Sequence, residues 1–344
     1  MRAALLTNTR ELELSDVPLP ELGADDVKIA VSLNGLCGTD VTEYAKGQRM
    51  VPLNYTHPGS GHHGPTVLGH EFIGTVVAAG ANAQALLGKR VACGAGVSCG
   101  ACPRCLEGRT NLCEHYYTLG LSTHGGLAEA VVAPANICVP IPDGLPDSEA
   151  VLAQPLAVGI HAANRAGVKP GDRVAILGVG AIGSFIAAGL LGQDITITAF
   201  DVDAGRFALA EQLGVAHTVL IEGDSSFDGQ GRFDVVFECT GVNGMAQRAY
   251  SLTRNGGTTV LVGLSKDAQS IDISDMVLRE ITTVTTVAHV CKTDLPVALE
   301  LLERFPLAEL LVSHTMTLDE LVAGGMNQLS DGAFSGKVIV DCQS

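Results

Sequence analysis

Apolar and polar positions follow two different patterns along this chain. From residue 1 to about residue 152, short apolar runs alternate with Gly and Pro turns, which is typical of a β-rich domain. From residue 153 to about 288, apolar runs of strand length alternate with helix-like stretches, which predicts a doubly wound parallel sheet. Strands are expected around Val174, Thr196, Thr218, Val235, Thr259 and Thr283. The last segment contains a helix-like stretch at 296–303 and a strand at 337–340.

One part of the second pattern predicts a dinucleotide site. A buried strand at 173–177 leads into a glycine-rich loop and a helix, and the next strand, 195–200, ends at Asp201. The loop consists of Gly178, Val179, Gly180, Ala181, Ile182 and Gly183. In such a loop the first glycine permits a tight turn, the second admits the pyrophosphate, and the third packs helix against strand. The helix N-terminus then favours the bound anion.

Asp201 predicts which nicotinamide cofactor is used. A carboxylate at the end of the second strand accepts hydrogen bonds from the ribose hydroxyls and repels a 2′-phosphate. Asp203 adds a second acid. Arg206 follows one turn later, where we expect it to stack on the adenine or to be solvated. These residues favour NAD(H) over NADP(H).

Four closely spaced cysteines predict a structural zinc site. They are Cys99, Cys102, Cys105 and Cys113. The spacing suits a closed tetrahedral site, which has no open position for chemistry. The alternative is that these thiols are free or form disulfides, but such spacing in a chain of cytosolic character favours a metal.

A catalytic zinc must keep one position open for the substrate. Candidate ligands are Cys37 and the adjacent residues His70 and Glu71, which follow Gly69. Thiolate, imidazole and carboxylate all suit zinc, and Gly69 permits the bent backbone that lets both neighbours face one ion. Taken alone, these three residues are an ambiguous signal.

Together, these motifs resemble the zinc-containing medium-chain dehydrogenase/reductase superfamily over essentially the whole chain. The polyol branch, with 2,3-butanediol, sorbitol and threonine dehydrogenases, is the most similar. The resemblance is carried by Cys37–Asp40 with Glu43, Tyr44 and Gly47, and by residues 65–71, 99–113, 125–129, 154–158, 178–183 and 336–340. The pattern Asp40-x-x-Glu43-Tyr44 and the insertion at 50–64 are most similar to butanediol dehydrogenases.

The resemblance implies a mixed α/β architecture with two domains. Residues 1–152 and 289–344 would form a β-rich, GroES-like catalytic domain, and residues 153–288 an NAD-binding Rossmann domain, with the active site in the cleft between them. It also implies two Zn²⁺ ions per chain. Cys37, His70 and Glu71 would hold the catalytic ion, and Thr39 would pass on the proton of the substrate.

Two positions depart from the pattern of the branch. Gln154 stands where most members have a Glu near the zinc. Some related glucose dehydrogenases also have Gln at this position. An amide can bind zinc weakly or hold its water; alternatively, Gln154 only packs near the domain junction. Thr42 replaces a His at the outer end of the proton relay. The relay would then end at bulk water or at a loop histidine, namely His57, His62 or His63.

We therefore expect a zinc-dependent NAD(H) alcohol dehydrogenase. It would interconvert a secondary alcohol, such as the vicinal diol 2,3-butanediol or a polyol, and its ketone. Alternatives are a glucose-type sugar or sugar-alcohol dehydrogenase, and a structural protein without activity on the same scaffold. A zinc-free enone or quinone reductase would lack both sets of zinc ligands. Relatives suggest a homodimer or homotetramer.

Composition narrows the range of partners. The chain has 344 residues, enough for two domains, and a net charge of −16, which argues against nucleic acid or an anionic membrane as a partner. No apolar run reaches membrane-spanning length, and the apolar run at the N-terminus is too short for a secretory signal peptide. We therefore expect a cytoplasmic protein. The remaining cysteines are expected to be free, buried thiols: Cys93, Cys138, Cys239, Cys291 and Cys342.

Overall fold

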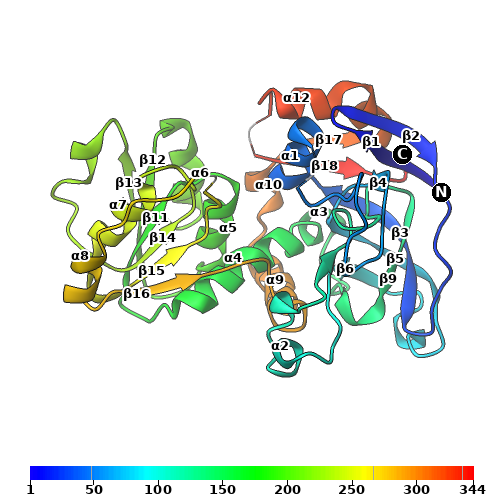
Figure 1. Ribbon diagram of the computed structural model, residues 1–344, viewed down its shortest axis with the longest axis horizontal. Coiled ribbons are helices and arrows are strands. Elements are labelled where there is room, and N and C mark those ends of the chain that lie inside the picture. The colour runs from blue at the N-terminus through cyan, green and yellow to red at the C-terminus, as the bar shows by residue number, and fades with distance from the viewer. Residues whose placement is uncertain (48, 266, 335) are drawn as a thin grey trace. The chain divides into compact units, whose positions relative to one another are not determined.

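The computed structural model describes residues 1–47, 49–265, 267–334 and 336–344, and it divides into two compact units. Unit 1 comprises Met1–Gln154 and His289–Ser344, and unit 2 comprises Pro155–Ala288. Both ends of the chain therefore belong to unit 1 (Figure 1).

Unit 2 is built on a parallel sheet of six strands in the order β13-β12-β11-β14-β15-β16. The strands are β11 (Arg173–Leu177), β12 (Thr196–Asp201), β13 (His217–Leu220), β14 (Phe233–Glu238), β15 (Thr253–Leu261) and β16 (Thr282–Thr285). Numbered from β11, this is the order 3-2-1-4-5-6 of a dinucleotide-binding sheet. All six strands predicted from the sequence are confirmed.

Helices cover this sheet, whose strands carry apolar residues on both faces. They are α5 (Ala181–Gly189), α6 (Phe207–Gln212), α7 (Met245–Leu252) and α8 (Ile273–Leu278). Strand β11 is a continuous apolar run from Val174 to Leu177, since all four of these side chains are fully buried in a sheet that is covered on both faces. Phe200, Phe233 and Leu177 pack together in the core between sheet and helices.

Unit 1 contains a mainly antiparallel sheet of seven strands in the order β10-β6-β5-β3-β18-β17, with β9 also paired to β3. Its strands are β3 (Asp26–Gly35), β5 (Glu71–Ala79), β6 (Arg90–Cys93), β9 (Ala130–Pro134), β10 (Cys138–Pro140), β17 (Val312–Thr317) and β18 (Lys337–Asp341). The C-terminal strand β18 pairs with β3, opposing Ile339 to Gly35. This pairing brings the last segment of the chain beside the first.

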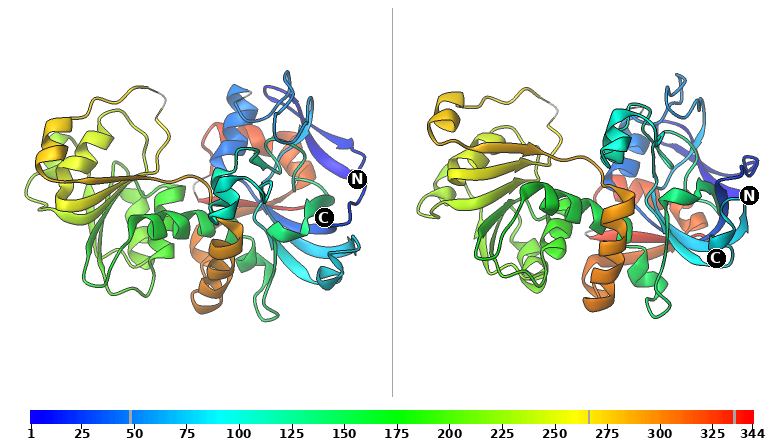
Figure 2. Two further views of the ribbon diagram at one scale, coloured as in Figure 1. Left: turned by 60° about the horizontal axis from the view of Figure 1, so that its bottom comes forward. Right: turned by 90° about the horizontal axis from the view of Figure 1, so that it is seen from below.

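Two small sheets and several helices complete unit 1. The small sheets contain β1 (Arg2–Asn8), β2 (Glu11–Asp16) and β4 (Thr66–Val67), and β7 (Gly96–Val97) and β8 (Tyr117–Thr118). The main helices are α1 (Gly38–Lys46), α2 (Pro103–Leu106), α9 (Cys291–Arg304), α10 (Ala308–Leu311) and α12 (Met326–Ser330). Helix α4 (Ala153–Ala166) begins in unit 1 and belongs to unit 2 from Pro155 onward. Figure 2 shows α9 in orange and β18 in red. Within the described residues, none of the helices has both the length and the apolar character that crossing a bilayer requires.

Candidate active site

Three predicted metal ligands come together in unit 1. Cys37 is the residue before α1, His70 precedes β5, and Glu71 is the first residue of β5. One ligand atom from each lies within 4.8 Å of the other two. Gly69 makes this possible: its φ is +92°, and a Cβ there would lie 2.6 Å from Asn34 Oδ1. A thiolate, an imidazole and a carboxylate at this separation fit a zinc ion with an open position.

Asp40 organises two of these ligands, a role that the sequence did not reveal. It is fully buried, and its Oδ2 accepts the Cys37 N–H at 2.9 Å. Its Oδ1 accepts the Gly69 N–H and lies 3.3 Å from His70 Nδ1. A carboxylate on one ring nitrogen leaves the other nitrogen to face a metal. Burial lowers the pKa of His70, but the charges of Asp40 and Cys37 outweigh burial and raise it well above its usual value.

Glu71 forms a buried ion pair with Lys337, the first residue of β18. Lys337 Nζ donates to Glu71 Oε2 at 2.5 Å and to the Leu36 carbonyl at 3.1 Å. Gly35 provides the room, since a Cβ there would lie 2.5 Å from Glu71 Oε2. No local pattern in the sequence signals this pair, because the two residues lie 266 positions apart.

The predicted catalytic residues Thr39 and Gln154 lie in the same unit, as does Thr42, which replaces the relay His. Thr39 Oγ1 is 3.7 Å from Cys37 Sγ. Thr42 Oγ1 donates to the Gly38 carbonyl at 2.8 Å, so its hydroxyl is engaged by its own helix. Gln154 is the second residue of α4 and is half-buried. A role for Gln154 at the metal remains a prediction.

The loop histidines make contacts of their own. His57 Nδ1 accepts two backbone N–H groups of its loop. His62 Nε2 lies 3.0 Å from Thr66 Oγ1, and its ring packs edge-on against His124. Burial lowers the pKa of both His57 and His62. His63 is exposed. The first two therefore hold the loop together, and their use as the end of a proton relay stays a prediction.

The four lobe cysteines also converge. The Sγ atoms of Cys99, Cys102, Cys105 and Cys113 all lie within 4.8 Å of one another. Backbone N–H groups bond to two of the sulfurs: that of Cys102 donates to Cys99 Sγ at 3.3 Å, and that of Cys99 donates to Cys113 Sγ at 3.2 Å. N–H groups of Glu114 and Cys105 lower the pKa of Cys102 to about 6. This donor set fits a structural zinc. All ten cysteines lie within the part of the chain that the structure describes, and none of them forms a disulfide bond there.

In unit 2, the glycine loop connects β11 to α5. Gly178 has a φ of +87°, and a Cβ on it would lie 2.6 Å from Thr240 Cγ2. A Cβ on Gly183 would meet the Gly178 carbonyl at 2.0 Å, whereas the nearest atom to a Cβ on Gly180 would be Arg206 NH1, at an ordinary contact distance of 3.6 Å. Ala181 and Ile182 begin α5, where the first N–H groups have no partner within the helix. The loop can therefore receive a pyrophosphate.

Asp201 ends β12, and each oxygen of its carboxylate accepts one backbone N–H group. Oδ2 accepts the Val179 N–H at 2.8 Å, and Oδ1 accepts the Asp203 N–H at 3.0 Å. Arg206 contacts both oxygens at 3.2–3.3 Å and also pairs with Asp203. Its side chain is 47% exposed. Arg206 thus pairs with two acids while it stays partly exposed to solvent, and its stacking on the adenine remains a prediction.

Comparison with known proteins places this geometry in a family. Residues 23–143 match the alcohol dehydrogenase GroES-like domain, and residues 178–304 match the zinc-binding dehydrogenase domain. Sorbitol dehydrogenase of Arabidopsis thaliana is 33% identical over 314 residues, which cover 87% of this chain and 83% of that protein. The chain belongs to the zinc-containing medium-chain dehydrogenases. It is a member of the polyol branch and an oxidoreductase that acts on alcohols.

Solved structures agree with this membership. 2R,3R-butanediol dehydrogenase from Bacillus subtilis superposes with a TM-score of 0.90 at 29% identity and covers 99% of both chains. A Sinorhizobium meliloti 1021 protein, solved bound to NADP, has a TM-score of 0.85 at 30% identity, over 99% of this chain and 98% of that one. The GroES-like and Rossmann architecture predicted from the sequence is confirmed.

Proposed function

We propose that this dehydrogenase oxidises a secondary alcohol to its ketone with NAD, and that the alcohol is a vicinal diol such as 2,3-butanediol or a polyol. The observation that supports it most is the convergence of Cys37, His70 and Glu71 to within 4.8 Å. The same chain carries a glycine-rich loop that leads into α5, and the next strand, β12, ends at Asp201. Relatives named sorbitol and butanediol dehydrogenase support the substrate class.

Each residue of the site has a task in this reaction. A zinc ion held by Cys37, His70 and Glu71 would polarise the substrate oxygen and lower the pKa of an alcohol. Thr39, whose hydroxyl lies beside Cys37 Sγ, would accept and pass on the hydroxyl proton. Asp40 would fix the orientation of the His70 ring.

Gln154 is the residue that separates the substrate alternatives. If its amide reaches the open position, it orients the substrate or a water molecule without adding a negative charge. Related glucose dehydrogenases sometimes carry Gln at this position. A sugar or sugar alcohol is therefore the second candidate substrate.

The cofactor is expected to be NAD. The Asp201 carboxylate, buried at the end of β12, suits two ribose hydroxyls and repels a 2′-phosphate. Arg206 NH1 lies 3.6 Å from the position of a Cβ on Gly180, so it borders the cofactor loop. Because one structural neighbour was solved with NADP, both cofactors belong in the test.

We also propose that the chain forms a homodimer through unit 2, from which a tetramer could be built. Strand β16 is the last of its sheet, and Thr282, Thr283 and Thr285 are exposed. The neighbouring helix α8 exposes Val277 and Leu278. An unpaired edge beside apolar side chains suits pairing with a second copy.

The first experiment is a substrate and cofactor screen of the purified protein. NADH or NADPH formation is followed with 2,3-butanediol stereoisomers, sorbitol, xylitol and glucose, and each assay is repeated after zinc chelation. Turnover that favours a diol or polyol, requires NAD and is lost on chelation supports the proposal. Preference for glucose would move the substrate to the sugar class, and no turnover with any of these would refute the proposed substrates.

A further inference from the structure

Glu43 is a buried acid to which the proposed reaction assigns no task. It lies in the second half of α1 and is 2% exposed. Its carboxylate accepts backbone N–H groups from three consecutive residues. Oε2 takes those of Arg49 at 3.0 Å and Val51 at 3.2 Å, and Oε1 takes that of Met50 at 3.2 Å. Charge-assisted bonds of this kind are stronger than neutral ones, so Glu43 fixes the backbone that follows α1.

The helix that carries Glu43 begins at the metal site. Cys37 is the residue before its first turn, and Asp40 ties that turn to the Cys37 N–H and to Gly69. Residues 49–64, called the clamped loop below, are therefore bound through Glu43 to the same rigid element that carries one proposed zinc ligand. The base of the clamped loop is closed by a bond from the Gly64 N–H to the Pro52 carbonyl.

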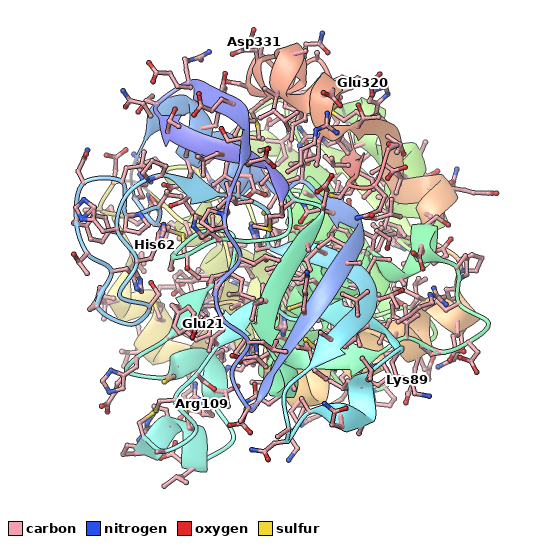
Figure 3. The ribbon with its side chains drawn as sticks, turned by 90° about the vertical axis from the view of Figure 1, so that its right-hand side faces the viewer. Glu21, His62, Lys89, Arg109, Glu320 and Asp331 are labelled. Carbon is pink, nitrogen blue, oxygen red and sulfur yellow. The ribbon has the colours of Figure 1, made fainter. Side chains whose placement is uncertain are left out.

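The other side of the clamped loop rests on the segment that supports His70. Ser60 Oγ donates to the Ser122 carbonyl at 2.5 Å. Gly120 packs so tightly on Gly69 that a Cβ on it would lie 2.1 Å from the Gly69 carbonyl. Figure 3 labels His62 on the clamped loop. The loop is thus tied to α1, which follows Cys37, and to Ser122, whose neighbour Gly120 packs on the residue before His70.

The clamped loop presents two large side chains that this anchoring holds in place. Met50 is 42% and Tyr55 38% exposed, and Tyr55 Oη donates to the Met50 carbonyl at 3.4 Å. Burial and the negative charge of Glu43 both raise the pKa of Tyr55, so the phenol of Tyr55 is close enough to interact electrostatically with the Glu43 carboxylate.

We propose that Glu43 is a positioning residue: its carboxylate holds the clamped loop in register with the metal ligands, and the held loop sets how tightly larger alcohols bind. The inference deepens the proposed alcohol dehydrogenase function and rests on it. Glu43 touches neither substrate nor cofactor in this scheme. Its effect is transmitted through the backbone of residues 49–51.

The conservative variant Glu43→Gln separates this role from simple packing. An amide oxygen can still accept the N–H groups of Arg49 and Val51, but the amide NH₂ then faces the Met50 N–H, so one bond becomes a donor–donor conflict. Glu43→Ala removes all three acceptors. Loosening of the loop should therefore increase from wild type to Gln to Ala.

Glu149 offers a matched control in the same unit. It is a buried carboxylate that accepts the backbone N–H groups of Leu307 and Ala308 at 2.7–3.0 Å. Glu149→Gln therefore weakens a similar clamp at a different place. It should lower thermal stability by a comparable amount and leave the clamped loop intact.

The test combines steady-state kinetics with hydrogen exchange on the zinc-loaded protein. For Glu43→Gln we expect the KM for sorbitol or 2,3-butanediol to rise about tenfold, with kcat and the KM for 2-propanol within about twofold. Amide exchange at residues 49–51 should accelerate in this variant and not in Glu149→Gln. The inference would be overturned if the ratio of KM for large to small alcohols stayed unchanged in both Glu43 variants. It would also be overturned if that ratio shifted equally in Glu149→Gln. Neither result would affect the proposed function. A wild-type protein that oxidises none of these alcohols would overturn the proposed function as well.

Discussion

The ion pair between Lys337 and Glu71 predicts a large loss of stability when the lysine charge is removed. The two side chains are only 7% and 2% exposed. Burial lowers the pKa of Lys337, but the charge of Glu71 outweighs burial and raises it above the usual 10.5. A raised lysine pKa means that the stabilisation is fully present at neutral pH and is lost only as the pH rises through that raised pKa.

The variant Lys337→Met keeps most of the side-chain volume and leaves the Glu71 carboxylate buried without its counter-charge. Removing one partner of a buried ion pair costs about 3–5 kcal/mol. For a domain of this size, each kcal/mol lowers Tm by about 2–4 °C, so the expected fall is roughly 6–20 °C. Adding Glu71→Gln removes the second charge and should recover most of that loss, because a neutral pair no longer buries an unpaired charge.

Thermal and urea unfolding of the chelator-treated protein at pH 7 measure this effect, with the exposed Lys46→Met as the control. The control should change the free energy of unfolding by under about 0.5 kcal/mol. Zinc added back should stabilise Lys337→Met more than wild type, since a cation on Glu71 replaces the missing charge. A loss below about 1 kcal/mol, or a double variant no more stable than the single one, would refute the reasoning.

Three further predictions concern acid stability, the cofactor and the cysteine lobe. Burial and His62 lower the pKa of His124 to about 4. Unfolding free energy should therefore fall by about 1–2 kcal/mol between pH 6.5 and 4, allowing for partial exposure, and His124→Gln should flatten that slope in urea melts. Asp201→Ala should raise the KM for NAD about tenfold and lower that for NADP, and an unchanged KM ratio would exclude Asp201 from cofactor selection. Cys105→Ser should reduce zinc from about two ions per chain to one by metal analysis and lower Tm; two retained ions would contradict the four-cysteine site.

Local patterns were sufficient for the parallel sheet, the glycine loop and the cysteine lobe. The apolar run at 173–177 and its glycine loop are adjacent in sequence, and the turn that Gly178 must make is a property of its own backbone. The four lobe cysteines are close in sequence and reach one point through short turns. In such segments the chain has few alternatives, so residue types and spacing determined the structure.

Contacts between distant segments could not be predicted in this way. The sequence placed Lys337 in a strand and Glu71 among the metal ligands, but their pairing depends on the register of β18 against β3 and of β3 against β5. The same holds for Asp40 beside His70. The pairing of Arg206 with Asp201 and Asp203 was likewise not predicted from the sequence. Residue types and short spacings fixed which groups are available for chemistry; strand register and burial, which depend on the whole chain, decided which charges face one another.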